Sequence, residues 1–146
     1  MKRQGFTLVE LVIVIIIVGI LSIVAVPIYR SYTLKAIGTE GKALMGAIAS
    51  AQQVHYTEYG NFQALSKTST DKPFGVDAKA NKFFREFTIT TGGDTTNHWW
   101  GATAVGDANT KAAGLTVELG GTDYTSGGVF LLYDETGTEI DRVARE

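Results

Sequence analysis

The chain has 146 residues, 45% of them hydrophobic, and its 13 basic and 15 acidic side chains give a formal net charge of -2. It contains no cysteine, which excludes a disulfide framework, a thiolate metal site and a cysteine nucleophile. The mild acidity gives no general argument for nucleic acid as a partner.

Residues 1–5 form a short basic leader that contains Lys2 and Arg3. No charged residue occurs between positions 11 and 28. As a helix, residues 11–29 are roughly 28 Å long at about 1.5 Å per residue, which is close to the hydrocarbon thickness of about 30 Å. The start of the chain therefore predicts one membrane-spanning helix with the leader on the cytoplasmic side.

Two other interpretations apply to such a start. An ordinary secretory signal peptide has a shorter apolar core, and the best cleavage site here, after Ala25, has Ile23 two residues before it. An uncleaved anchor is harder to exclude by hydropathy, but an inert anchor needs no carboxylate, and Glu10 stands in the apolar segment. A cut after Gly5 would expose an amino group on Phe6, four residues before Glu10 and therefore at the spacing of helix neighbours.

One continuous motif reads Lys2-Arg3-Gln4-Gly5-Phe6-Thr7-Leu8-Val9-Glu10, and an apolar span with Pro27 follows it. This start resembles that of type IV prepilins and type II secretion pseudopilins, over about residues 1–32. The resemblance implies that prepilin peptidase cuts after Gly5, that the nitrogen of Phe6 is methylated, and that Glu10 acts in subunit docking. Gly19 and Pro27 are the weak points of the helix, and the resemblance implies that this segment unwinds in assembled pili.

A regular spacing of apolar residues predicts that the helix continues through residues 30–59 as an amphipathic half, after a membrane-spanning half at 6–29. Its predicted inner face is Ile37, Leu44, Ile48, Ala51 and His55. Gly60 after Tyr59 is a natural stop. Three glycines, Gly38, Gly41 and Gly46, indicate close packing against the sheet or neighbouring helices.

Residues 60–82 are polar and predict a connecting surface loop, and residues 83–146 predict an antiparallel sheet region. Strands are expected at 83–91, 99–105, 115–119 and 129–133, with a further candidate at about 139–143. The predicted fold class is α+β: a long N-terminal helix packed on an antiparallel sheet of about four strands, the type IV pilin fold. One of Trp99 and Trp100 should lie in the core and the other should be partly exposed.

The sequence offers few other candidate sites, and it predicts no enzyme, catalytic residue, metal site or cofactor. Basic residues gather in or beside the loop, which favours a solvated loop over a DNA-binding patch: Lys67, Lys72, Lys79, Lys82 and Arg85. An acidic cluster near the C-terminus, Asp134, Glu135, Glu139 and Asp141, favours hairpin charges over a calcium site. His55 and His98 are expected to be packing residues.

The functional prediction is a type IV pilus subunit, an inner-membrane precursor that becomes part of an extracellular or periplasmic filament. Its expected partners are other copies of the chain, prepilin peptidase, the inner-membrane assembly machinery and, before assembly, the membrane; nucleic acid is possible but unsupported. The alternatives are a pseudopilin of type II secretion or DNA uptake and, from another class, a monomeric membrane-anchored binding module. The absence of cysteine and of an Asp-Pro-Trp-Gly stretch favours a pilin over a pseudopilin only modestly.

Overall fold

The structure is a computed structural model that describes residues 6–65, 75–93, 98–121 and 129–144. The chain divides into two compact units, Met1–Thr33 and Leu34–Glu146. Helix α1 (Leu8–Tyr59) contributes residues to both units, and the second unit also contains five strands and the 3-10 helix η2 (Ala78–Ala80). The fold is therefore α+β, which confirms the predicted class.

The described part of the first unit consists mainly of the N-terminal part of α1, which begins at Leu8. All side chains from residue 6 to residue 32 are exposed. By its length and apolar composition, α1 is the one helix among the described residues that meets the requirement for crossing a membrane. The helix continues through Pro27, although proline has no N–H to donate to the carbonyl four residues earlier.

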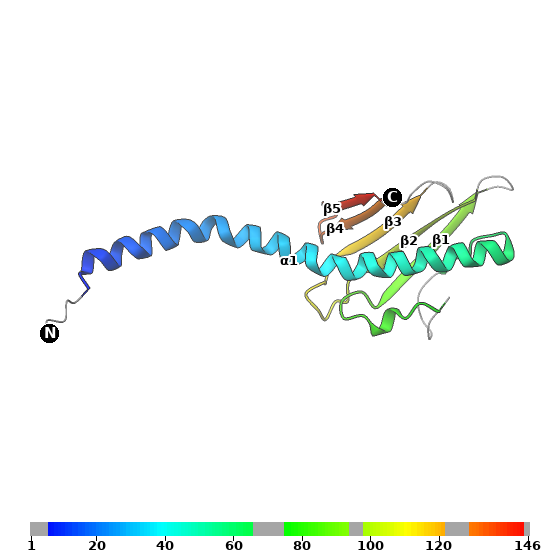
Figure 1. The fold of residues 1–146 in the computed structure, drawn as a ribbon, viewed down its shortest axis with the longest axis horizontal. Coiled ribbons are helices and arrows are strands. Elements are labelled where there is room, and N and C mark those ends of the chain that lie inside the picture. The colour runs from blue at the N-terminus through cyan, green and yellow to red at the C-terminus, as the bar shows by residue number, and fades with distance from the viewer. Residues whose placement is uncertain (1–5, 66–74, 94–97, 122–128, 145–146) are drawn as a thin grey trace. The chain divides into compact units, whose positions relative to one another are not determined.

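The second unit is built on one antiparallel sheet with the strand order β1-β2-β3-β4-β5. The strands are β1 (Glu86–Gly93), β2 (His98–Val105), β3 (Thr116–Gly121), β4 (Val129–Tyr133) and β5 (Glu139–Ala144). Each strand pairs with the next one along the chain, so the sheet is a meander, and the second-unit part of α1 lies along one of its faces (Figure 1). The sheet has one strand more than the expected four, because the further candidate segment pairs with β4.

The core lies between α1 and the sheet. Alternate strand residues face the helix, because successive side chains of a strand point to opposite faces. On the sheet side the core contains Phe87, Ile89, Ala102, Ala104, Val117, Leu119 and Leu132, and on the helix side Ile37, Leu44, Met45, Ile48 and Ala49. The prediction of the inner helix face is confirmed for Ile37, Leu44 and Ile48.

Towards its C-terminal end, the predicted helix face is only partly confirmed, because Ala51 packs against the core. Ala51 and His55 are only half-buried, whereas Gln52 is completely buried. The Gln52 Nε2 atom donates to the carbonyl of Gln63 at 2.7 Å, and its Oε1 atom accepts from the backbone N–H of Gln63 at 3.1 Å. Because both ends of the amide are bonded, burial of this polar side chain carries no unsatisfied group.

The end of α1 is confirmed at Tyr59. Gly60 follows in the left-handed region with φ of 73°, and its N–H donates to the Tyr56 carbonyl at 2.8 Å. Glycine adopts this backbone conformation without the steric cost that a Cβ atom imposes, so it closes the helix here.

Two of the three glycines in the second-unit part of α1 bring the helix close to the sheet. A Cβ atom added at Gly38 would lie 2.5 Å from Leu132 Cδ2, and one added at Gly41 would lie 2.7 Å from Val117 Cγ2. A Cβ atom at Gly46 would meet nothing within 4 Å. Close packing on the sheet is therefore confirmed for Gly38 and Gly41 and does not explain Gly46.

Charged side chains of α1 tie other segments to the helix. The Glu40 carboxylate accepts three consecutive backbone N–H groups, from Lys82 at 3.1 Å, Phe83 at 2.6 Å and Phe84 at 2.9 Å. Lys42 forms an ion pair and hydrogen bond with Asp141 of β5. One helix charge thus fixes the entry to the sheet, and the other fixes its last strand.

The connecting segment is more structured than the predicted surface loop. Phe62, Val76 and Ala78 are buried, and Leu65 forms an antiparallel bridge with Ile89 of β1. β1 begins at Glu86 rather than at position 83, since the backbone N–H groups of residues 82–84 are directed to Glu40. The three buried side chains therefore belong to the core, while most other described residues of this segment are exposed, and residues 66–74 lie outside the described residues.

The tryptophan pair is placed as predicted. Trp100 packs against the core, whereas Trp99, on the opposite face of β2, is 42% exposed. The Trp99 ring covers Gly92, its cross-strand partner in β1, where an added Cβ atom would lie 2.4 Å from the indole. Gly92 therefore provides the space in which this ring lies flat on the sheet.

Candidate functional site

The candidate site is the start of α1, where Thr7 and Glu10 form a reciprocal set of hydrogen bonds. The Thr7 backbone N–H donates to Glu10 Oε2 at 2.8 Å, and the Thr7 hydroxyl donates to the same oxygen at 2.7 Å. In return, the backbone N–H of Glu10 donates to Thr7 Oγ1 at 3.2 Å. This arrangement is a capping box, which satisfies backbone donors that the first helical turn leaves without partners.

Thr7 is the functional candidate that the sequence-based interpretation missed. The signal was present, because Thr7-Leu8-Val9-Glu10 has the Ser/Thr-x-x-Glu spacing and an apolar run follows it. The capping box explains why α1 begins at Leu8 and leaves Phe6 before the helix. Glu10 consequently has a role in the single chain, in addition to any role between chains.

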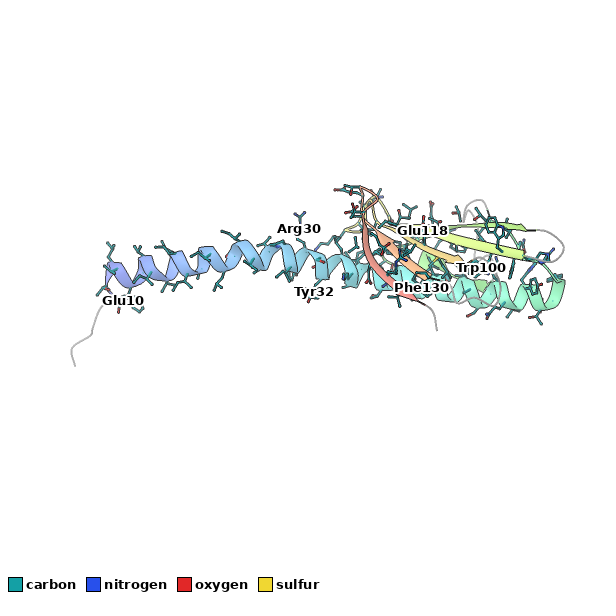
Figure 2. All side chains as sticks on the ribbon, turned by 90° about the horizontal axis from the view of Figure 1, so that it is seen from above. Glu10, Arg30, Tyr32, Trp100, Glu118 and Phe130 are labelled. Atoms are coloured by element: carbon teal, nitrogen blue, oxygen red, sulfur yellow. The ribbon has the colours of Figure 1, made fainter. Side chains whose placement is uncertain are left out.

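The structure separates two of the residues that the sequence relates through helical spacing. Phe6 is 81% exposed and precedes α1, so Phe6 and Glu10 are not neighbours on one helix within this chain. Gly5 lies outside the described residues. The Glu10 side chain at the start of the helix is labelled in Figure 2.

The Glu10 carboxylate keeps one open oxygen. Both Thr7 donors bind Oε2, and within the described part of the chain no hydrogen bond reaches Oε1. The next charged residue along the helix is Arg30. An exposed carboxylate with an unused acceptor can bind a cationic N–H donor that comes from outside this segment.

The predicted weak points of the helix, Gly19 and Pro27, lie within unbroken α1. No atom lies within 4 Å of a Cβ added at Gly19. Between them, the Ser22 hydroxyl donates to the Val18 carbonyl at 2.7 Å, a local bond of the kind that bends helices slightly. In this structure the segment is helical, and its unwinding stays a prediction.

Three of the four C-terminal acidic residues that were considered for calcium, Asp134, Glu139 and Asp141, are bonded to other side chains or backbone groups. Hydrogen bonds from Thr136 and Thr138 lower the pKa of Asp134, and the Arg142 guanidinium lowers the pKa of Glu139. The pKa of Asp141 is lowered chiefly by its bond from Lys42. The described residues contain no group of three or more histidine and acidic side chains that could hold a metal ion.

The histidines and the described basic residues lie in ordinary packing and surface environments. The ring centroids of His55 and Tyr59 are 4.6 Å apart, and those of His98 and Tyr56 are 5.8 Å apart in an edge-to-face arrangement. Arg85 lies 3.8 Å from Asp107, in a shallow hollow that contains both signs of charge. Lys67 and Lys72 lie outside the described residues.

The start of the chain matches a known family model. The family model of the prokaryotic N-terminal methylation motif matches residues 1–26. The matched residues, here called the prepilin segment, carry this motif. The capping box and the open carboxylate oxygen of Glu10 lie within this prepilin segment.

Several pilins are similar to the chain. A fimbrial protein of Neisseria meningitidis is 40% identical over 77 residues, which cover 53% of this chain and 45% of that protein. The type IV major pilin protein PilE1 of Neisseria gonorrhoeae is 37% identical over 90 residues, 62% of this chain and 41% of PilE1. A fimbrial protein of Pseudomonas aeruginosa is 36% identical over 77 residues, 52% of this chain and 49% of that protein.

The chain spans less than half the length of each of these relatives. No solved structure matches it. The similarity therefore identifies the prepilin segment and leaves more than half of each relative unmatched.

Proposed function

We propose that the chain is the precursor of a structural subunit of a type IV pilus, which acts by polymerising through α1. The observation that carries the proposal is the prepilin segment itself: a methylation motif, a capped helix start and an open Glu10 oxygen precede an uncharged helical span. The names of the similar proteins, fimbrial protein and type IV major pilin, support a pilus in preference to a pseudopilus.

Processing converts the precursor into the form that assembles. Prepilin peptidase cuts after Gly5, and the new amino group of Phe6 is methylated. Phe6 is exposed and precedes the helix, so the backbone next to the cut is not held in helical hydrogen bonds. Before assembly, residues 6–29 span the inner membrane with Lys2 and Arg3 on the cytoplasmic side, and the sheet unit lies outside.

Docking then joins the Phe6 amine of one subunit to the Glu10 carboxylate of another. In the unassembled chain Thr7 occupies Oε2, and Oε1 remains available for the incoming cation. An ion pair between packed apolar helices is costly to leave half-formed, by about 3 to 5 kcal/mol, so the pair selects one docking register. Gly19 and Pro27 let the helix unwind as the assembly machinery draws subunits from the membrane.

The first test is the N-terminus of protein from filaments, measured by mass spectrometry. We expect N-methylated Phe6 and no residues 1–5. The Gly5→Val variant should accumulate as uncut precursor, because a branched side chain replaces hydrogen at the cut. Filament protein that retains the leader would contradict the processing step.

The second test separates docking from processing. Glu10→Val should be inserted and cut normally, while filament yield falls sharply because the incoming amine finds no carboxylate. Co-expression with the wild-type chain should let some variant subunits enter filaments beside normal ones. Wild-type filament yield from Glu10→Val alone would refute the docking step, and filaments confined to the periplasm would assign the chain to a pseudopilus.

A further inference from the structure

Arg30 is the first charged residue after Glu10, at the far end of the uncharged span. Its side chain is exposed, and the exposed rings of Tyr29 and Tyr32 lie near it in sequence, at 72% and 70% exposure. Figure 2 labels Arg30 and Tyr32 on this part of the helix. Arg30 and Tyr32 point to opposite sides of the helix (Figure 2), so the cation and the phenol rings follow the apolar run on different faces.

In the part of the chain that the structure describes, no group neutralises Arg30. Its helix neighbours at three and four residues are Val26, Pro27, Thr33 and Leu34, none of them acidic. Among the described residues no carboxylate forms an ion pair with Arg30, whereas Lys35 and Lys42 both lie against Asp141. The Thr33 hydroxyl is also occupied, because it donates to the Tyr29 carbonyl at 2.9 Å. The charge of Arg30 is therefore directed to a partner outside the chain.

The position of Arg30 along the helix indicates what that partner is. The uncharged residues 11–29 extend roughly 28 Å at about 1.5 Å per residue, which nearly equals a hydrocarbon core of about 30 Å. When the leader lies at one surface of the membrane, Arg30 lies at the opposite surface, among lipid headgroups. The anions at that level are phosphates, and the planar guanidinium binds two phosphate oxygens at once.

The tyrosines fit the same location. A tyrosine ring places its apolar body against acyl chains and its hydroxyl among headgroups, which is why such rings gather at membrane surfaces. Tyr29 and Tyr32 are three residues apart and hence lie on neighbouring positions of one helix side, with Arg30 between them in sequence. The two rings can therefore fix the depth of the helix on their side, while the Arg30 guanidinium holds a headgroup phosphate on another side at the same level.

We propose that Arg30 binds the phosphate of a phospholipid headgroup in the outer leaflet of the inner membrane and, with the rings of Tyr29 and Tyr32 at the same level of the membrane, fixes the depth of the unassembled subunit. This inference rests on the proposed membrane-inserted precursor. It assigns Arg30 a role that the prepilin motif does not include, because that motif matches residues 1–26. The phosphate contact must break when the subunit leaves the membrane.

The test uses the full chain in nanodiscs, and the absence of cysteine allows one labelling site. Ser31→Cys carries a spin label next to Arg30, and its depth is read from collisions with a polar nickel chelate and with oxygen. In phosphatidylcholine discs the Arg30→Gln variant should lower nickel accessibility about twofold, because the helix loses its headgroup contact. Arg30→Lys should fall between the two, since it keeps the charge but loses the two-pronged geometry.

A second part of the test varies the lipid headgroup. In discs of phosphate-free digalactosyl lipid, the chain with Arg30 should show the low accessibility of Arg30→Gln. Added inorganic phosphate should not restore it, because a free ion does not fix depth. Lys35→Gln, which removes a charge five residues later, is the matched control and should leave accessibility unchanged in both kinds of disc.

Each result decides the proposal. Equal accessibility of Arg30→Gln and the parent chain in phosphatidylcholine overturns it, as does a parent chain that keeps its depth without lipid phosphate. Restoration by inorganic phosphate would assign the site to a free anion instead. Failure of the chain to insert into any disc, or an uncut leader in cells, would instead contradict the proposed function, so the two failures are distinguishable.

Discussion

Two glycines on the same helix should respond in opposite directions to the same substitution. Gly41→Ala adds a Cβ atom 2.7 Å from Val117 Cγ2 and 3.1 Å from two ring carbons of Phe84. Val117 and Phe84 are both completely buried, so neither can move aside without disturbing the core. Gly46→Ala adds a Cβ atom that meets nothing within 4 Å. The pair thus separates helix propensity from packing.

The expected magnitudes follow from these contacts. Replacing glycine by alanine in a helix interior is worth about 1 kcal/mol, which should appear in full at Gly46. At Gly41 the same gain is opposed by an overpacking cost of about 1 to 3 kcal/mol, so the net effect should be destabilising by roughly 1 kcal/mol. The two variants should therefore differ by about 2 kcal/mol in the free energy of unfolding.

Urea unfolding of residues 29–146 measures the difference. We expect this fragment to be a soluble monomer, because the core lies wholly within the second unit. With a slope of about 1 to 3 kcal/mol per molar urea, the midpoints should lie roughly 1 M apart. Stabilisation by both substitutions would refute the reasoning that Gly41 exists for close approach of helix and sheet.

Further predictions concern polar groups. Glu40→Gln should destabilise the fragment by about 2 kcal/mol. The hydrogen bonds from Phe83 and Phe84 would then reach a neutral oxygen, and the N–H of Lys82 would face the amide NH₂ group. Glu118→Gln, on the outer face of the sheet, is the matched control and should change stability little. The bond from Lys42 lowers the pKa of Asp141, so its contribution to stability is full above the ordinary aspartate pKa and is lost as the pH falls through the lowered pKa. Asp141→Asn should therefore flatten the stability profile below the ordinary aspartate pKa. Thr7→Val should speed amide exchange in the first turn of α1 in micelles, whereas Thr7→Ser should retain protection.

The long helix and the strands were predictable because their signals are local. An uncharged run, a glycine after Tyr59 and short apolar segments between glycine-rich turns each indicate one element without reference to the rest of the chain. The same local rule predicts that Trp99 and Trp100 face opposite sides of β2. The structure agrees on each of these points.

The tethers between elements were not predictable, because their partners are distant in sequence. Lys42 and Asp141 are 99 residues apart, and Glu40 binds backbone groups 42 to 44 residues away. A sequence pattern gives no measure of such distances, so it singles out neither Glu40 nor Lys42. The burial of Gln52 in place of His55 has the same origin, since its partner is the backbone of a returning segment.

The charges of α1 divide into two groups according to where their partners lie. In the second unit Glu40 and Lys42 are bonded to the segment before β1 and to β5, and losing either contact should lower the stability of the sheet domain. In the first unit, and among the described residues, the side chain of Glu10 accepts hydrogen bonds only from Thr7, and Arg30 forms no ion pair.

This division predicts a double dissociation. Measured in the full chain, Glu10→Val and Arg30→Gln should leave urea unfolding of the sheet domain unchanged, because neither side chain contributes to its core. Glu10→Val should instead alter filament yield, and Arg30→Gln should alter membrane depth. Glu40→Gln should do the reverse in the unassembled chain, lowering stability without changing the depth of a label at position 31. If the first two substitutions also weakened the sheet domain, their effects on assembly would have a simpler cause in folding. Glu10 and Arg30 would then not be reserved for partners outside the chain.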